Sequence, residues 1–389
     1  MPEIKKITLK DGSTVYRFVV DVGRHPETGL RQQRTFTFDL RREAQAELDR
    51  IRHQRRTGDY VMSSPTTVTE ALDKLVPALC VDVEEATREN FADAVRPVRS
   101  FLGERRVQSL DEQDIDDLVE FMLTRGRVRG GKPGTGLGAR TVALTLGRLR
   151  AVLNEAVRRK MVVRNVATHT RVPREARKQA AAVRASRTPW TEAEVKAFLR
   201  AIRDHRLFPV LMLAFMGMRP GEVCGLRWSD VDLDAGEVGI ANTRTLVRRE
   251  VIEKDTKSES GTRLLPVPAP VLATLKTFKA RQAAERLAAG PAYTDTGYVL
   301  VDELGMPQRT DWLRRRAYNL MDEHKARRVR LYDARHATLT ALAAAGVPAP
   351  IIAAWAGHSD GGQLAMRTYI KPSTEHLRVA SDALARMLG

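Results

Sequence analysis

The segment "FMGMRPGEVCGLRW", residues 215–228, joins an apolar run to the predicted start of a new helix. Pro220 suits the first position of a helix, because proline lacks the N–H group that a helix leaves unpaired there. Glu222 then lies one turn in, so backbone geometry partly fixes Arg219 at the junction. Taken alone, the segment fits either an ordinary turn with an Arg–Glu surface pair or a binding site built around a fixed arginine.

Two later segments carry further cationic and aromatic side chains. Lys257 lies in "DTKSESGTRLLPVP" (255–268), a polar turn that enters a predicted strand. On its own it is typical of a solvated loop lysine. In "RLYDARHATLTALAAAG" (330–346), Tyr332 and Arg335 are three residues apart at the start of an apolar helix. This spacing places both side chains on one face of that helix.

The segment "AWAGHSDGGQLAMRTYI", residues 354–370, contains His358 directly after a glycine and Tyr369 eleven residues later. Taken alone, Tyr369 is a half-buried aromatic near the end of the chain.

The order and spacing of these segments resemble the catalytic domain of the tyrosine recombinases, the phage integrase family. The family pattern is an arginine in an R-x-x-E turn, a lysine on a β-hairpin, H-x-x-R, then G-H and a tyrosine about ten residues later. Here it is carried in order by "MRPGEVCGLRWSDVDL", "DARHATLTALA" and "AGHSDGGQLAMRTY". The "YDARH" variant and the Arg- and Ala-rich composition resemble integrases of actinobacterial phages or integrative elements. The matching residues are Arg219 with Glu222, Lys257, Arg335, His358 and Tyr369.

The resemblance implies that Tyr369 attacks a DNA phosphodiester and forms a 3′-phosphotyrosine and a free 5′-hydroxyl. The two matching arginines would stabilise the charge of the transition state. Lys257 would protonate the departing 5′-oxygen, and His358 would bond a non-bridging oxygen. Glu222 would orient the arginine or the histidine without contacting the phosphate itself. The covalent bond retains the energy of the phosphodiester, so we expect no ATP, no cofactor and no metal.

One position departs from the family pattern, because Tyr332 stands where H-x-x-R has its histidine. A phenol can donate or accept a hydrogen bond, but it cannot match imidazole as a base near neutral pH. We therefore expect Tyr332 to be a positioning donor and Tyr369 to be the nucleophile. His336 is interpreted as a structural histidine.

The composition favours a polyanionic partner. Lys plus Arg number 65 against 48 Asp plus Glu, which gives a formal net charge of +17 and a pI near 10.2. The alternative is a solvated, arginine-rich surface. Cys80 and Cys224 lie far apart in apolar helical patterns, which argues against a disulfide or a zinc cluster. The longest apolar run, 209–218, is too short to span a bilayer. We expect a cytoplasmic, nucleoid-associated protein without a membrane partner.

We predict a multidomain chain, mainly α with small β elements. Strand-like alternation and a basic helix come first, helical periodicity follows, and strands at 236–242 and 262–268 interrupt the last region. By the resemblance, the parts are an arm-type DNA-binding domain of β-sheet plus helix (1–62), a helical core-site DNA-binding domain (66–172), a basic linker (173–188), a mixed α/β catalytic domain (189–372) and a tail helix for subunit docking (373–389).

The expected partners are double-stranded DNA at core and arm attachment sites and three further copies of the chain, as a homotetramer. An excision factor and a DNA-bending host protein would complete the assembly. Two other functions remain open at this point. One is a catalytically inactive, architectural DNA-binding protein, and the other is a type IB-like topoisomerase that acts as a monomer.

Overall fold

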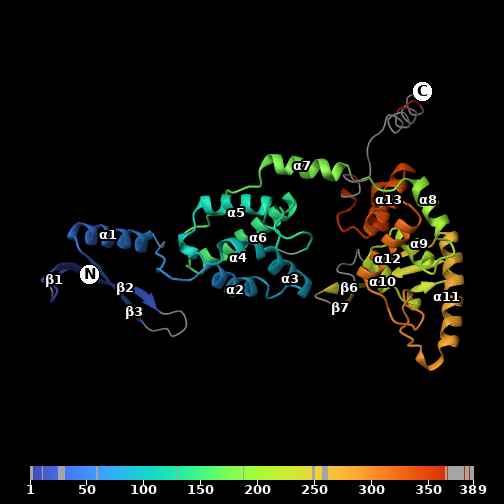
Figure 1. Ribbon diagram of the computed structural model, residues 1–389, viewed down its shortest axis with the longest axis horizontal. Coiled ribbons are helices and arrows are strands. Elements are labelled where there is room, and N and C mark those ends of the chain that lie inside the picture. Colours follow the sequence, from blue (N-terminus) through green and yellow to red (C-terminus); the bar gives the residue numbers. More distant parts are fainter. Residues whose placement is uncertain are drawn as a thin grey trace. The chain divides into compact units, whose positions relative to one another are not determined.

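The computed structural model describes residues 3–10, 12–24, 31–57, 60–128, 130–186, 188–247, 250–255 and 262–363, with residues 366, 381 and 385. The chain forms two units, Met1–Ser186 and Arg187–Gly389 (Figure 1). Helices predominate in both, and the strands form small sheets, as the sequence predicts. Among the described residues, no helix combines the length and the apolar character needed to cross a membrane.

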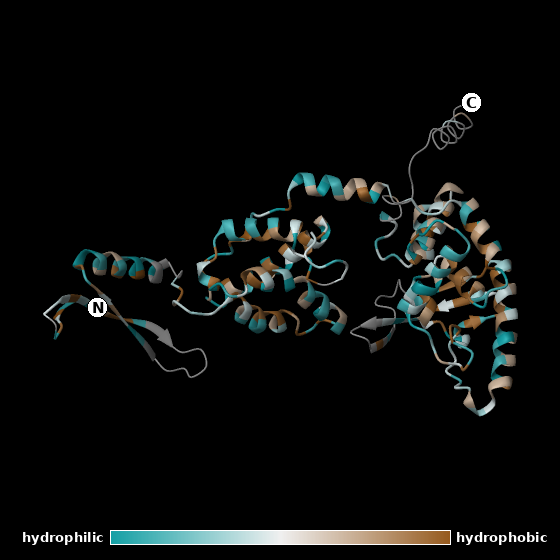
Figure 2. Cartoon of the chain, viewed as in Figure 1, coloured by the Kyte–Doolittle hydropathy of each residue, from teal (hydrophilic) through white to brown (hydrophobic). Residues whose placement is uncertain are grey.

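The N-terminal residues form a three-stranded antiparallel sheet in the order β1-β2-β3, followed by a helix. The elements are β1 (Lys5–Thr8), β2 (Thr14–Arg24), β3 (Arg31–Phe38) and α1 (Arg41–Thr57). The strand-like alternation predicted for this region is confirmed: β2 and β3 pair as a hairpin, and β1 is an additional strand on β2. Figure 2 shows that α1 is largely hydrophilic, and only a narrow stripe of it packs on the sheet. The buried core residues here are Phe18, Val20, Ala44, Leu48 and Ile51.

A helical bundle with its own core follows. Its helices are α2 (Val68–Leu79), α3 (Glu85–Ala94), α4 (Arg96–Leu102), α5 (Glu112–Thr124) and α6 (Ala139–Arg158), with a short 3-10 turn, η1 (Val107–Ser109).

The sequence specifies where these helices begin and which face they bury. Thr67 with Glu70 and Asp111 with Asp114 form capping boxes at α2 and α5, each pairing amide groups that the first turn leaves unpaired. The apolar residues that recur at helical spacing along α6 are buried at Val142, Leu146, Leu149 and Leu153.

The predicted basic linker contains a helix, α7 (Arg174–Ala185). Its alanine, arginine, lysine and glutamine residues have high helix propensity, which favours a helix even though none of its residues is buried. The segment is therefore a helical spacer rather than a flexible coil.

The second unit combines nine named helices in the described ranges with two small sheets. The helical elements are α8 (Glu192–Ala201), α9 (Phe208–Phe215), α10 (Pro220–Gly225), η2 (Trp228–Asp230), α11 (Ala269–Ala289), η3 (Gly290–Ala292), α12 (Thr310–Glu323), α13 (Leu331–Ala344) and α14 (Ala349–Ala356). The strands are β4 (Val231–Asp232), β5 (Glu237–Ile240), β6 (Asn242–Val247), β7 (Glu250–Asp255) and β8 (Arg263–Pro266).

The strands predicted at 236–242 and 262–268 correspond to β5 and β8, which pair antiparallel in the sheet β4-β5-β8. Strands β6 and β7 form a separate hairpin. Helix α9 is apolar on nearly all sides and packs against α10, α11 and α13. It thereby supports the junction that carries Arg219, at the start of α10. Cys80 and Cys224 are free and buried.

Replacing Leu149 by alanine should destabilise the helical bundle. Leu149 is fully buried in α6, so the change removes apolar contacts and leaves a cavity that costs about 2–5 kcal/mol. Urea unfolding measures the loss. Leu144→Ala, at an exposed position of the same helix, is the control and should change stability by less than about 0.5 kcal/mol. Equal losses in the two variants would contradict this description of α6.

Candidate active site

Arg219 lies at the junction between α9 and α10, where the sequence predicts it. It is the extended residue just before α10, and Pro220 is the first helical residue. Its backbone N–H donates to Glu222 Oε2 (2.8 Å) and its Nη1 donates to Glu222 Oε1 (2.6 Å). Its Nη2 donates to the carbonyl oxygen of Gly357 (2.9 Å), which precedes His358 in the chain. The guanidinium is thus held between two segments 138 residues apart.

Glu222 is a buried carboxylate shared by two arginines. Its side chain is 1% exposed, and it also accepts hydrogen bonds from Arg263 Nη1 (3.1 Å) and Nη2 (3.0 Å). Burial acts to raise the pKa of Glu222, but the bonds and charge of Arg263, followed by those of Arg219, leave that pKa below its ordinary value. Glu222 is therefore ionised at neutral pH and fixes both guanidiniums.

Arg263 is a residue of this site that the sequence patterns did not identify. It begins β8, and its Nε donates to the carbonyl oxygen of Trp355 (2.8 Å). The available signal was the alternation of "TRLLPVP", which turns Arg263 and Leu265 to the inner side and Leu264 to solvent. A basic residue on the inner side of a strand requires a buried partner, which here is Glu222.

Arg335 is a buried cation without a carboxylate partner among the described residues. It is 1% exposed on α13 and donates to the carbonyl oxygens of Gly217 (2.7 Å) and Ala356 and to His358 Nε2 (3.2 Å). Its Nε is buried and has no hydrogen-bond partner in this part of the chain. Burial, with the nearby charge of Arg219, lowers the pKa of Arg335 to about 10. The site therefore holds positive charge that its own side chains leave uncompensated.

His358 is placed by a left-handed turn at the end of α14. Gly357 has φ 60° and ψ 51°, a conformation that favours glycine, and the His358 N–H donates to the carbonyl oxygen of Ala353 (2.9 Å). Arg335 can only donate, so His358 Nε2 is the acceptor and the neutral ring carries its proton on Nδ1. Burial and the charges of Arg335 and Arg219 lower the pKa of His358. The imidazole is thus neutral at pH 7, with a buried Nδ1 that has no partner among the described residues.

The chain turn before Arg219 presents carbonyl oxygens to this site. Gly217 has φ 105°, and a Cβ there would lie 3.3 Å from Trp355 Nε1. Trp355 Nε1 donates to the carbonyl oxygen of Met216 (2.8 Å), and the Thr338 hydroxyl donates to that of Phe215. These bonds connect the end of α9 to α13 and α14. They fix the backbone segments that bond Arg219 and Arg335 relative to one another.

Tyr332 lies one turn before Arg335 on α13 and is 43% exposed. Its ring meets that of His336 edge to face, with centroids 5.3 Å apart. Burial lowers the pKa of His336, which favours its neutral form. Two predicted residues, Lys257 and Tyr369, lie outside the described residues, as does nearly all of the tail 373–389.

The structure therefore brings Arg219 and Glu222, Arg335, and His358 together from three separate parts of the sequence and adds Arg263 from a fourth. Three arginines and one carboxylate leave two net positive charges. A shallow pocket adjoins them, lined by Thr262, Arg263, Pro350, Ala353, Ala354, His358 and Gly361. Such an arrangement can bind a singly charged phosphodiester and stabilise the additional charge of its transition state.

Residues 190–376 match the phage integrase family, so this part of the second unit is a domain of the tyrosine recombinases. Members of the family are enzymes that cleave and rejoin DNA.

Several relatives match along most of their length. A tyrosine recombinase XerC-like protein of Caldanaerobacter subterraneus subsp. tengcongensis is 24% identical over 90% of this chain and 91% of its own. An integrase of Streptomyces ambofaciens is 25% identical over 88% of this chain and 86% of its own. The ICEBs1 integrase of Bacillus subtilis is 22% identical over 84% of this chain and 85% of its own.

Two solved structures share the fold. The Tn1549 transposon integrase in complex with transposon right end DNA superposes with a TM-score of 0.65 at 18% identity, covering 82% of this chain and all of that one. A lambda integrase dimer bound to a COC' core site superposes with a TM-score of 0.55 at 15% identity, covering 94% of each chain.

Replacing Glu222 by glutamine should destabilise the second unit in a pH-dependent way. Breaking a buried ion pair on one side costs about 3–5 kcal/mol, because the remaining charges stay buried. The folded-state pKa of Glu222 is lowered, so its contribution is present above its ordinary pKa of 4.5 and is lost as pH falls through the lowered value. The stability gap between parent and variant, measured by urea unfolding across pH, should therefore narrow in acid.

The control for this comparison is Glu192→Gln, which alters an exposed carboxylate paired with Lys196 on α8. It should leave the unfolding curve nearly unchanged at neutral pH. A gap for Glu222→Gln that widens in acid would refute the assignment of a lowered pKa.

Proposed function

We propose that the protein is a site-specific DNA recombinase, an integrase that cleaves and rejoins DNA to integrate or excise a mobile element or phage genome. The observation that carries the proposal is Arg335, a buried guanidinium bonded only to neutral acceptors among the described residues, beside Arg219 and neutral His358. Burying a cation without a counter-ion costs stability. A phosphate group entering this site would supply the missing negative charge.

Arg219, Arg335 and His358 would act on the non-bridging oxygens of the scissile phosphate. The phosphate acquires a second negative charge in the five-coordinate transition state, and donors already in place gain most from that increase. Glu222 is a positioning residue in this scheme, because it bonds Arg219 directly, and Arg263 holds Glu222 in place while it also lines the adjoining pocket. Arg335 Nε and His358 Nδ1 are buried and have no partner among the described residues, and we propose them as further donors to the phosphate.

The covalent step is assigned from the sequence pattern. The Tyr369 oxygen attacks phosphorus, the bond to the 5′-oxygen breaks, and that oxygen takes a proton from Lys257. A phenol has an ordinary pKa of about 10, and we propose that the cationic residues of the site assist the loss of the proton from Tyr369. The free 5′-hydroxyl of a partner strand then reverses the step, which rejoins the DNA without ATP.

A nicked duplex from which a short fragment is lost after cleavage should trap the protein on DNA through Tyr369. Digestion and mass spectrometry of the complex identify the modified peptide. Tyr369→Phe should give no adduct, whereas Tyr332→Phe should still give one. An adduct on Tyr332 would overturn the choice of nucleophile.

Two outcomes of the trapping experiment would favour the rival functions. DNA binding with no adduct on any residue would indicate an architectural DNA-binding protein. Adduct formation with relaxation of supercoils by the monomer on DNA of any sequence would indicate a topoisomerase.

Removing the hydroxyl of Tyr332 should slow cleavage about tenfold, since one hydrogen bond to the phosphate is worth about 1–1.5 kcal/mol. Tyr332 is exposed and lies one turn from Arg335, which suits a donor that reaches the ligand. Single-turnover cleavage by Tyr332→Phe measures the effect, with Tyr318→Phe on α12 as the control. A parental rate for Tyr332→Phe would exclude this role.

We further propose that residues 1–62 bind arm sites and 66–172 bind core sites in double-stranded DNA, while 189–372 carry the chemistry. The basic helix α1 and the arginine-rich spacer around α7 support contact with a phosphate backbone. Four copies would act on two duplexes through a four-way junction. The tail 373–389 would dock on a neighbouring copy, and an excision factor and a DNA-bending host protein would direct the reaction.

A further inference from the structure

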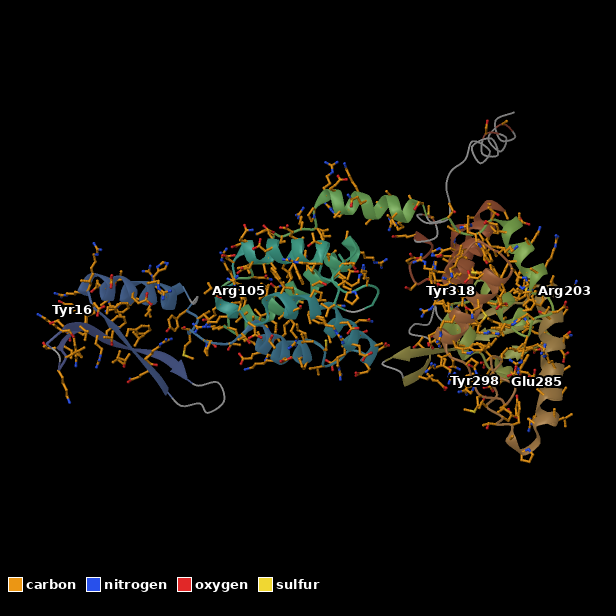
Figure 3. All side chains as sticks on the ribbon, in the orientation of Figure 1. Tyr16, Arg105, Arg203, Glu285, Tyr298 and Tyr318 are labelled. Atoms are coloured by element: carbon orange, nitrogen blue, oxygen red, sulfur yellow. The ribbon has the colours of Figure 1, made fainter. Side chains whose placement is uncertain are left out.

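A second polar pocket lies in the same unit, where β6, β7 and the segment around Tyr298 meet the end of α10. Arg227 and Tyr298 form an isolated antiparallel bridge at this point. None of the residues assigned to the phosphate chemistry above lines the pocket. Tyr298 is labelled in Figure 3 on the same unit as the β6–β7 hairpin. The lining residues are Gly225, Arg227, Asn242, Thr243, Arg244, Glu253 and Tyr298.

Two guanidiniums converge in this pocket on one aromatic ring. Arg227 lies 5.0 Å and Arg244 lies 5.3 Å from the ring centroid of Tyr298, and Arg227 Nη2 donates to the Tyr298 hydroxyl (3.1 Å). Arg244 is only 9% exposed, and its Nη1 donates to the carbonyl oxygen of Gln308 (3.0 Å). Tyr298 and Gln308 thus hold both cations at fixed positions.

The backbone around the pocket is built for close approach. A Cβ on Gly225 would lie 3.0–3.1 Å from the backbone atoms of Thr243 and Arg244. Glycine at the end of α10 therefore lets β6 pack directly against this helix. The close packing places Arg244, on β6, beside Arg227, two residues after α10.

Glu253 currently occupies the pocket as its anion. It accepts a hydrogen bond from Arg227 Nη2 (3.2 Å), and its Oε1 lies 3.3 Å from Arg244 Nε. A hydrogen bond from Tyr298, together with the charges of both arginines, lowers the pKa of Glu253. The pocket therefore stabilises an oxyanion.

The fit of Glu253 is incomplete. Arg244 Nε is buried and, within the described part of the chain, has no partner in hydrogen-bonding geometry, although the carboxylate is close. Glu253 is also 47% exposed and belongs to β7, which pairs only with β6 in the described sheets. The two arginines and one carboxylate keep one net positive charge, so a second anion is favoured here.

We infer that this pocket binds a non-scissile phosphate of the DNA backbone, and that Glu253 is an internal placeholder which the phosphate displaces. The inference rests on the proposed function only in taking DNA as the partner. A phosphodiester presents two non-bridging oxygens in a tetrahedral arrangement, so one can accept from Arg227 Nη2 while the other accepts from Arg244 Nε. The planar carboxylate of Glu253, a residue of β7, accepts a hydrogen bond from Arg227 Nη2 but not from Arg244 Nε in this structure.

The two partners of this ion pair should have opposite effects on DNA affinity. Arg227→Ala should weaken binding about tenfold and reduce the salt dependence by about one phosphate contact. Glu253→Gln should tighten binding severalfold, because the competing anion is lost. Fluorescence anisotropy with a random-sequence duplex across a salt series measures both, in a Tyr369→Phe background that cannot form a covalent adduct.

Arg286 and Asp295 provide a matched control pair, since they form an ion pair of similar exposure elsewhere in the same unit. Arg286→Ala and Asp295→Asn make the same changes in net charge without touching the pocket. The gain in DNA affinity should be larger for Glu253→Gln than for Asp295→Asn. The difference between the two gains should vanish when Arg227→Ala is also present. This coupling separates displacement in the pocket from a general charge effect.

Weaker binding by Glu253→Gln would show that the cluster is a structural ion pair and would overturn the inference. Effects no larger than those of the control pair would also overturn it. Because binding is measured without covalent chemistry, these outcomes are independent of the trapping experiment at Tyr369. Failure to trap an adduct while the two variants still shift affinity in opposite directions would refute only the proposed reaction.

Discussion

The second unit depends on one buried carboxylate, Glu222, which lies between two guanidiniums and ties three segments together. It fixes Arg219 at the start of α10 and Arg263 at the start of β8, and these arginines in turn bond carbonyl oxygens next to His358. A buried ion pair of this kind adds little net stability, because desolvation offsets most of the attraction. Its contribution is to fix the positions of the Arg219 and Arg263 guanidiniums, because both are bonded to the same carboxylate.

Arg335 has a different role, because its partners in the described chain are neutral. Two carbonyl oxygens and one imidazole hold it in place while leaving its charge largely uncompensated. The cost of that burial appears as a lowered pKa, caused first by desolvation and then by Arg219. A site that bears such a cost in the free protein is complementary to an incoming anion, and more so to one whose charge grows during reaction.

The same reasoning distinguishes the two arginine clusters of the second unit. In the first, the carboxylate of Glu222 is buried and bonded to both arginines. In the second, Glu253 is half exposed on an edge strand and stands in the anion position itself. Burial of the carboxylate therefore distinguishes the residue proposed to position its neighbours from the residue proposed to be displaced, although both are glutamates paired with two arginines.

The sequence by itself determined the order of elements, the helix starts at Thr67, Asp111 and Pro220, and the apolar stripe of α6, because these depend on contacts between near neighbours in the chain. Through the resemblance of its motifs to those of the tyrosine recombinases, it also predicted which residues would act on a phosphate. It did not reveal that the spacer around α7 is helical, because the segment has no stripe of large apolar residues and buries none of its side chains. Only the tertiary structure decided that Arg263 joins Glu222, that Arg335 has no carboxylate partner in the part of the chain that the structure describes, and that Arg227 meets Glu253. Each of these pairings spans a long stretch of chain, and packing alone determines which charges become neighbours.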